Sequence, residues 1–321
     1  MKLREAMVVG CMVSVLSGSV QAALPLTPAD ARAQINTDSS LISGWLTDQF
    51  KVAIPFNSTA GNVVPDQLKI FGFEVGAEAV GSTSKVDTGA FHNLPTNIID
   101  TNQINTFNRL PVPMVMGQAK IGLPFGLDAG VRIGGIPSTS HDDGTTHVDV
   151  TNSVFGLDLR KALIEEEMIH PFGLTLGLNF TRAKGHITAT TPYTSSSPNL
   201  TFSSDAMGSA RTDWDTKSVG AQLIMNKKIL FLNPYIGAAA NKNFGTVSTS
   251  IANSGTFTVN SVTGSLDGTG GSGSATPNTW DLRGMAGIEF SILPFVRLGI
   301  GAEIASQGNL AASLGLRLQF R

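Results

Sequence analysis

The chain has 321 residues, with 22 Lys and Arg against 24 Asp and Glu, and only 14% of its residues are charged. Its mean hydropathy is +0.12. Beyond the N-terminus no apolar run reaches the roughly 18 residues of a membrane-spanning helix, which excludes a polytopic helical membrane protein. The near-neutral charge argues against nucleic-acid binding, and abundant Gly, Ser and Thr favour an all-β protein.

Residues 1–22 have the pattern of a secretory signal peptide. Basic residues at the start precede an apolar stretch at 6–16, and small residues at 20–22 form a cleavage site. We therefore expect export and removal of this segment. The single cysteine, Cys11, would leave with it, so the mature chain would have no disulfide.

Residues 23–66 are predicted to be an N-terminal capping or plug segment. Thr27-Pro28-Ala29-Asp30 is typical of a helix start, with Pro at the first helical position. Apolar residues then follow at helical spacing: Ala31, Ile35, Ile42, Trp45, Leu46 and Phe50. Three alternatives stay open: a helix that caps the periplasmic mouth of a barrel, a movable plug in its lumen, or a disordered segment.

Residues 67–321 alternate between apolar and polar side chains. The last segment is the clearest, because Leu310, Leu314 and Phe320 share one parity with other apolar residues over eleven positions. This is the length of a tilted membrane strand. The alternation recurs in ten segments, at 71–77, 115–123, 127–133, 155–159, 174–180, 212–227, 233–247, 282–290, 296–302 and 310–320. We predict an all-β, antiparallel transmembrane β-barrel of about ten strands with a short N-terminal helix. Twelve strands would result if 49–56 and an extended loop pair joined the sheet.

The connections alternate in length, as expected for short periplasmic turns and long external loops. An even number of strands would put both ends of the chain in the periplasm. Aromatic residues are expected to form a girdle at the turns, namely Phe71, Phe125, Phe172, Tyr235, Phe290, Phe295 and Phe320. A thinner outer girdle would consist of Phe180, Trp214 and Trp280.

The C-terminus resembles the assembly signal of bacterial outer-membrane β-barrels. Its pattern is a polar residue, Gly, a hydrophobic residue and an aromatic residue, here Ser313, Gly315, Leu318 and Phe320. This implies recognition by the barrel assembly machinery, although Arg321 follows the usual terminal aromatic residue.

Three upstream motifs strengthen the resemblance: Phe91-x-x-Leu94-Pro95-Thr96, Leu110-Pro111-Val112-Pro113-Met114 and Gly122-Leu123-Pro124-Phe125-Gly126. Together they are similar to a family of uncharacterised outer-membrane barrels. More distantly, the layout resembles the fatty-acid and hydrocarbon transport barrels, which are longer. The resemblance implies a compartment and a fold, but no activity.

The inward parity carries charges of both signs. They are the candidate lumen residues Glu74, Glu78, Lys120, Asp128, Arg132, Asp158, Arg160, Asp281, Arg283, Glu289, Arg297, Glu303 and Arg317. A hairpin register across 291–294 would set Glu289 opposite Arg297 and Arg283 opposite Glu303, which favours pairing. Two interpretations remain open, a salt-bridge network that fills the lumen and a polar filter for a small solute. Many inward glycines would leave room for a slender channel.

Two polar regions are candidate external sites. The segment 141–149 contains His141, Asp142 and His147, which are weak candidates for a cation site or a general base. No catalytic motif supports them, so we expect no enzyme activity, no bound metal and no cofactor. The loops 189–211 and 248–278 are too polar to order themselves alone and could extend strands or meet a partner.

These patterns lead to three hypotheses. The first is a passive outer-membrane channel for a small solute. The second is a closed structural or surface-interaction barrel that acts through its external loops. The third is an enzyme with its site in 141–149. The expected partners are outer-membrane lipid, lipopolysaccharide and the assembly machinery, and we expect a monomer.

Overall fold

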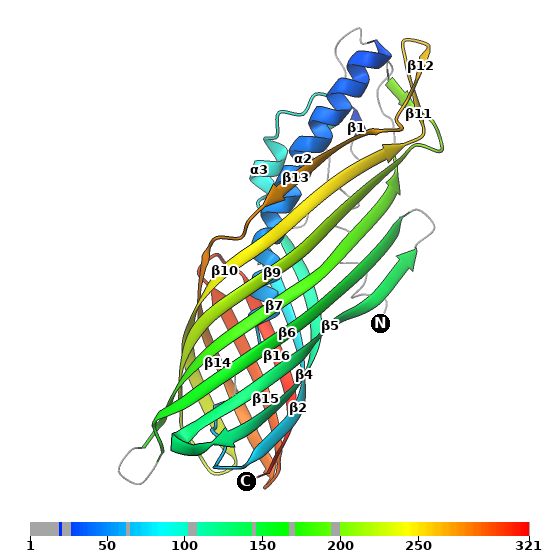
Figure 1. The fold of residues 1–321 in the computed structure, drawn as a ribbon. Coiled ribbons are helices and arrows are strands. Elements are labelled where there is room, and N and C mark those ends of the chain that lie inside the picture. Colours follow the sequence, from blue (N-terminus) through cyan, green and yellow to red (C-terminus); the bar gives the residue numbers. More distant parts are fainter. Residues whose placement is uncertain are drawn as a thin grey trace.

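In the computed structural model, the described residues are 19–20, 27–61, 65–101, 108–142, 146–166, 171–193 and 200–320. Ten antiparallel strands close into one ring, each paired with its neighbours along the chain and the last paired with the first (Figure 1). They are β2 (Phe73–Lys85), β4 (Arg109–Leu123), β5 (Leu127–Asp142), β6 (His147–Ile164), β7 (Gly173–Pro192), β9 (Met207–Asn226), β10 (Leu232–Ser254), β14 (Trp280–Leu293), β15 (Val296–Ala305) and β16 (Leu310–Phe320). The prediction of a ten-stranded barrel is confirmed.

The apolar parity of the strands faces outward. On β16, Leu314 and Leu316 are 52% and 53% exposed, whereas Arg317 and Gln319 on the other parity are 4% and 2% exposed. This is the reverse of a soluble protein, and it gives the barrel an apolar outer wall and a polar interior, as a membrane requires.

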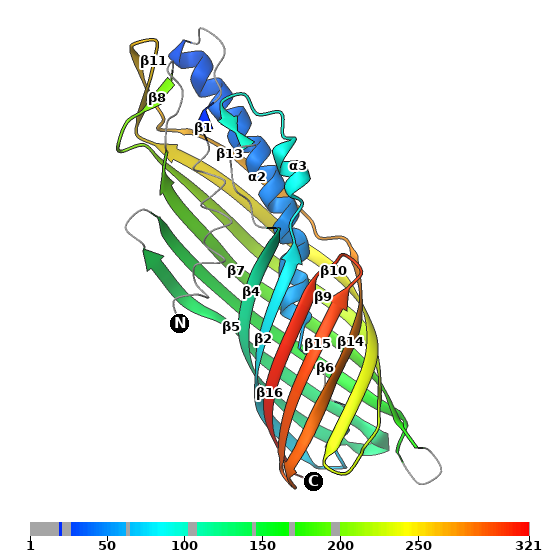
Figure 2. The same ribbon diagram turned by 180° about the vertical axis from the view of Figure 1, so that it is seen from behind.

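The two ends of the barrel differ. Both Phe73, where β2 starts, and Phe320, where β16 finishes, lie at the end with the short connections, which we call the turn end. The opposite, long-loop end carries α3 (Thr88–His92), β3 (Ile99–Asp100), β8 (Leu200–Phe202), β11 (Thr256–Val259), β12 (Val262–Ser265) and β13 (Thr269–Ala275). Figure 2 shows α3, β8, β11 and β13 beyond the rim of the short strands β15 and β16. The predicted alternation of loop lengths holds only in part, because the long-loop end has long connections at 86–108, 193–206 and 255–279 but short ones at 143–146 and 306–309.

The wall is taller on one side. The strands β7, β9 and β10 have 20, 20 and 23 residues, whereas β15 and β16 have 10 and 11. In its first residues, 109–114, β4 pairs with β2 but not with the described part of β5. Pro111 and Pro113 lie on this stretch, where a residue without an N–H is tolerated. The tall strands thus form a half-wall above the rim of the short ones.

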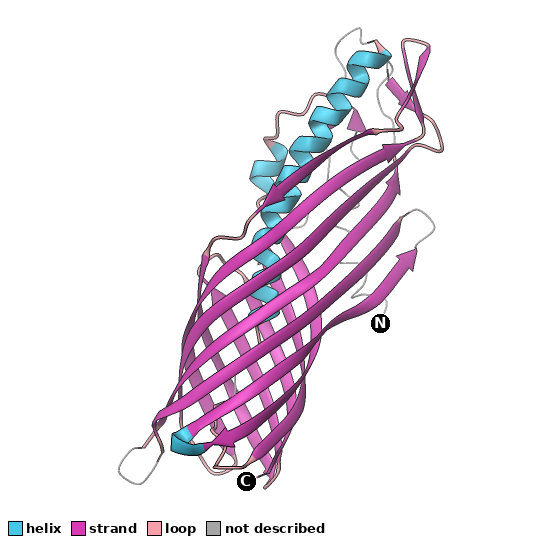
Figure 3. Cartoon of the chain, in the orientation of Figure 1, coloured by secondary structure: helices cyan, strands magenta, loops and turns pink. Residues whose placement is uncertain are grey.

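A 32-residue helix, α2 (Pro28–Thr59), stands against the inner face of this half-wall and descends into the barrel (Figure 3). It starts at a capping box in which Thr27 and Asp30 bond each other's backbone N–H. No helix among the described residues is long and apolar enough to cross a membrane. Residues 49–56, proposed as a possible strand, belong to α2, so the twelve-strand alternative is wrong.

The helix enters from the long-loop end. Its upper part packs on β13 and β10, and its last turn lies beside Val80 and Arg283 inside the ring. Residues 65–72 continue to the turn end, where the Phe71 N–H donates to the carbonyl of Gly122. The expectation of a cap over the turn-end mouth is therefore wrong for the helix. Because the chain threads the lumen, Thr27 lies at the end opposite Phe320.

Candidate functional site: the barrel interior and its turn-end mouth

The upper interior, toward the long-loop end, is an apolar core shared by helix and wall. Every residue of the predicted helical stripe is buried. Phe50 stacks on Trp214 of β9 with ring centroids 6.4 Å apart, and Trp45 packs on Phe91 at 4.5 Å. Sequence alone placed Trp214 in an outer girdle, but its 5% exposure and its contact with the helix correct this.

The lower interior is a charged tier. The structure places all thirteen predicted lumen charges inside the ring, none more than 8% exposed. Arg317 pairs with Glu289 and with Glu74, whose Oε2 lies 3.4 Å from its Nη1. Arg160 forms a two-pronged pair with Asp128, with both N–O distances 2.7 Å. Buried ions of both signs thus neutralise one another.

One hairpin register differs from the prediction. In β14 and β15, Arg283 faces Ala305 and Ser291 faces Arg297, because the strands run on to Leu293 and Val296 and the connection between them is shorter than predicted. The predicted partners still meet diagonally. Arg283 Nη1 lies 3.0 Å from Glu303 Oε2, and Arg297 Nε lies 3.9 Å from Glu289 Oε1. Long side chains reach the diagonal neighbour, so the wrong register gave the right pairs.

A cluster around Arg283 anchors the end of α2. Its guanidinium donates to Thr59 Oγ1 at 2.7 Å, pairs with Asp281 and Glu303, and lies 4.8 Å from the ring of Phe56. The backbone N–H of residue 61, just past the helix, donates to Glu303 at 2.7 Å. The helix end is therefore held to the wall by a buried ionic cluster.

A second contact holds α2 to β2. Ser82 Oγ donates to Asn57 Oδ1 at 2.7 Å, and both residues are buried. Higher up, Asp38 accepts the backbone N–H groups of 97–99 at 2.7–3.2 Å. Burial raises the pKa of the Asp38 carboxyl, although those hydrogen bonds oppose the shift. These positions carry no sequence motif, and only the fold brings them together.

The space beside several inward glycines is filled. A Cβ on Gly76 would lie 2.6 Å from Arg317, and one on Gly287 would lie 2.3 Å from the Tyr235 hydroxyl. One on Gly122 would lie 1.9 Å from the Lys69 carbonyl oxygen. Neighbouring side chains, together with residues 65–72, which we call the threaded segment, occupy the space that these glycines provide. Tyr235, which was expected in a girdle, is one of these neighbouring side chains and is buried.

Several polar atoms of the charged tier lack a hydrogen-bond partner among the residues that the structure describes. They include Lys120 Nζ, Gln118 Oε1 and Gln319 Nε2, on residues no more than 8% exposed. A buried ammonium or amide left without a partner is costly, so such groups need water or a polar solute. The charged tier therefore holds polar groups that a water molecule or a polar solute would satisfy.

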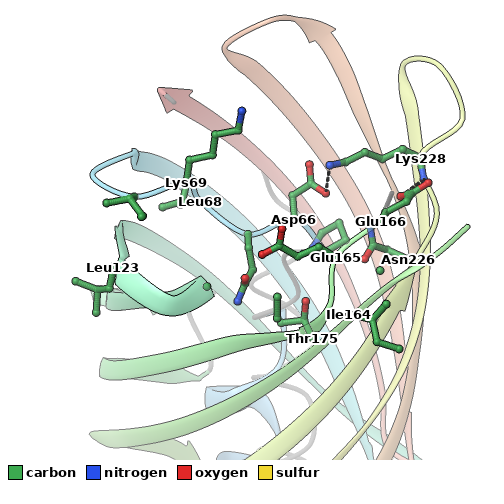
Figure 4. A pocket seen from close by; sticks show the side chains of 16 residues that line it. Asp66, Leu68, Lys69, Leu123, Ile164, Glu165, Glu166, Thr175, Asn226 and Lys228 are labelled. Atoms are coloured by element: carbon green, nitrogen blue, oxygen red, sulfur yellow. Dashed lines mark hydrogen bonds and ion pairs between the residues drawn. The ribbon is translucent and has the colours of Figure 1, made fainter. Parts of the chain in front are cut away.

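The turn-end mouth holds a pocket of about 580 Å³. Figure 4 shows Asp66, Lys228 and Glu166 together, with Lys69 and Leu123 farther across. Asp66 Oδ1 lies 3.1 Å from Lys228 Nζ and accepts from the buried Asn233 amide at 2.9 Å. The backbone N–H of Lys228 donates to Glu166 at 2.9 Å. The threaded segment thus lies between this pocket and the charged tier.

The segment 141–149 is described only in part. Residues 143–145 lie outside the described part of the chain. His141 and Asp142 end β5, and His147 starts β6, with His147 Nδ1 3.7 Å from Asp142 Oδ2 on an exposed surface. Among the described residues, no group of three or more His, Cys, Asp or Glu could hold a metal ion.

The predicted assembly signal occupies β16. Leu318 and Phe320 are on its outer face, 39% and 41% exposed, whereas Ser313 and Gly315 share the inward parity. Phe320 stacks on Phe73 with centroids 4.7 Å apart. Recognition by the assembly machinery stays a prediction. The signal-peptide prediction falls on residues of which only Ser19 and Val20 are described, pairing as β1 (Ser19–Val20) with β3.

A closed antiparallel ring with an apolar outer wall and a polar interior defines an outer-membrane β-barrel, and this chain is one. More particularly, it belongs to a family of unknown function, DUF6588, whose model matches residues 28–320. No curated protein matches the chain.

Solved structures with a similar fold are outer-membrane barrels. The outer-membrane protease OmpT from Escherichia coli matches at 10% identity and a TM-score of 0.43, covering 82% of this chain and 100% of its own. The KdgM porin matches at 5% identity and 0.31, covering 76% and 99%. Neisserial surface protein A matches at 14% and 0.30, covering 77% and 97%.

Proposed function

We propose that this outer-membrane barrel is a gated passage for a small polar solute, and that α2 is its plug. The observation that carries the proposal is the charged tier with unpartnered buried polar atoms between the last turn of α2 and the turn-end pocket. Charges of both signs suit a zwitterionic or hydroxylated solute. We propose no catalytic role.

The anchors of α2 are suited to reversible release. They are hydrogen bonds and ion pairs rather than covalent links, and the mature chain is expected to contain no cysteine. Withdrawal of the helix toward the long-loop end would break the Arg283 cluster and the Asn57–Ser82 contact. The apolar core above would resist this movement, so passage would be rare at rest.

The test is planar-bilayer conductance of refolded mature protein, with folding shown by heat-modifiable gel migration. An Asn57→Cys/Ser82→Cys protein would lock α2 to β2 when oxidised, and the two single variants are controls. We expect discrete steps in the wild type, none in the oxidised double variant, their return on reduction, and larger steps in a protein lacking residues 24–56. Silence of every folded form would refute the passage.

A closed surface-interaction barrel is the second candidate function. The filled glycine sites and the tall half-wall favour it, because they close the lumen and project polar strands beyond the apolar belt. The hairpin of β11 and β12 belongs to this projection, where it pairs with β8 and packs on the start of α2. Its removal should abolish surface binding to cells or phage if this function holds, and should leave conductance unchanged.

A further inference from the structure

The outer wall has a groove within its apolar belt. The groove spans β7, β9, β10, β14 and β15 and has a volume of about 760 Å³. Small outward residues make it hollow, namely Ala221, Ala238, Ala240 and Gly284, and larger ones border it, namely Leu176, Leu223, Leu282 and Ile304. Its size and apolar lining fit an acyl chain.

A group of cations lies beyond this groove, toward the long-loop end. Lys242 follows Ala240 by two residues on the same face of β10, about 7 Å along the strand. In the neighbouring row, Lys217 of β9 is the cross-strand partner of Arg182 of β7. Lys184 follows Arg182 on the same face, so four cations gather above one apolar groove.

This cluster has an excess of positive charge. The one carboxylate within it, Asp215, is held by Arg182, with N–O distances of 2.9 and 2.5 Å. Lys184 and Lys217 form no ion pair with any residue that the structure describes. Four cations against one acid leave a net charge of +3, and the next acid along β9, Asp213, is already paired with Arg211.

An aromatic residue marks the same level. Trp280 of β14 is 60% exposed on the outer face, and Lys242 Nζ lies 5.6 Å from its ring centroid. Amphipathic aromatic rings with nearby Lys or Arg are typical of the boundary between acyl chains and headgroups. The groove therefore lies at acyl-chain depth, and the cations lie at headgroup depth.

We propose that this face binds a phosphorylated, acylated lipid of the outer leaflet, of the lipid A class. One acyl chain lies in the groove, and a phosphate meets Lys242, Lys217 and Lys184. A neutral lipid would not use the cations, and a free phosphate would not use the groove. Each Lys or Arg near an anionic headgroup contributes about 1 kcal/mol. The site also orients the barrel, with its long-loop end outward.

The test measures binding of diphosphorylated lipid A, and of its dephosphorylated form, to the folded barrel in detergent by native mass spectrometry. Lys217→Glu/Lys242→Glu removes the cations, and Ala240→Trp fills the groove. Lys85→Glu, an exposed lysine at the same end of β2, is the matched control. Heat-modifiable migration shows that each variant is folded.

We expect the wild type and the Lys85→Glu control to prefer the phosphorylated lipid, and the double charge variant to bind it at least about tenfold more weakly. Ala240→Trp should weaken both lipids, and inorganic phosphate should not compete. Equal binding of the two lipids by the wild type would overturn the proposal. So would a charge variant that binds like the control, or full competition by inorganic phosphate.

Discussion

Replacing Arg283 by Met tests whether the buried ionic cluster anchors the plug. The substitution keeps much of the side-chain length but leaves Asp281 and Glu303, 3% and 7% exposed, without their cation. It also removes the hydrogen bond to Thr59. Breaking one partner of a buried ion pair costs about 3–5 kcal/mol. We expect a loss of about 4 kcal/mol in the free energy of unfolding.

The assay is urea unfolding of the refolded barrel in micelles, followed by tryptophan fluorescence, together with single-channel recording. Arg211→Met is the control, because its ion pair with Asp213 is nearly half exposed and should contribute less than about 1 kcal/mol. Arg283→Met should also raise the frequency of conductance steps. Equal losses in the two variants would refute the assigned anchor, and Arg283→Lys provides a milder change should the Met variant not fold.

Three further predictions concern the threaded segment and the helix. Gly122→Ala should destabilise the barrel by about 1–3 kcal/mol, because its Cβ would lie 1.9 Å from the Lys69 carbonyl oxygen. The control Gly81→Ala, whose Cβ would have nothing within 4 Å, should change stability by less than about 0.5 kcal/mol. Equal melting temperatures of the two variants would contradict this prediction. Phe50→Ala should cost about 3–5 kcal/mol in urea unfolding, since the ring is only 4% exposed in the apolar core. The raised pKa of Asp38 means that the folded state binds this proton more tightly, so its contribution to stability is greatest below pH 3.8 and falls as pH rises through the raised pKa. Protease nicking of the connection that it fastens should increase over this range in the wild type and lose this pH dependence in Asp38→Asn.

The sequence predicted the strands because a membrane barrel imposes one rule on every residue of its wall. Outward side chains meet lipid and inward ones do not, so period-2 alternation revealed ten strands and the thirteen inward charges on them. The helix start at Thr27 was also predictable from a short stretch of sequence, because a capping box joins residues only three positions apart. Tyr235 and Trp214 were misplaced because they were judged by height along the strand and not by parity.

What the sequence alone determined is the wall: its strand number, its apolar outer face and its inward ions. Tertiary structure decided what lies inside. Whether a helix caps the turn end or enters from the opposite end depends on contacts between residues more than 200 positions apart, such as Thr59 with Arg283. The same holds for the inward glycines. From the sequence they were expected to leave empty space, but in the folded chain Arg317, Tyr235 and the Lys69 backbone fill the space beside three of them. Local alternation encodes the direction of a side chain, but only closure of the ring brings its partner within reach.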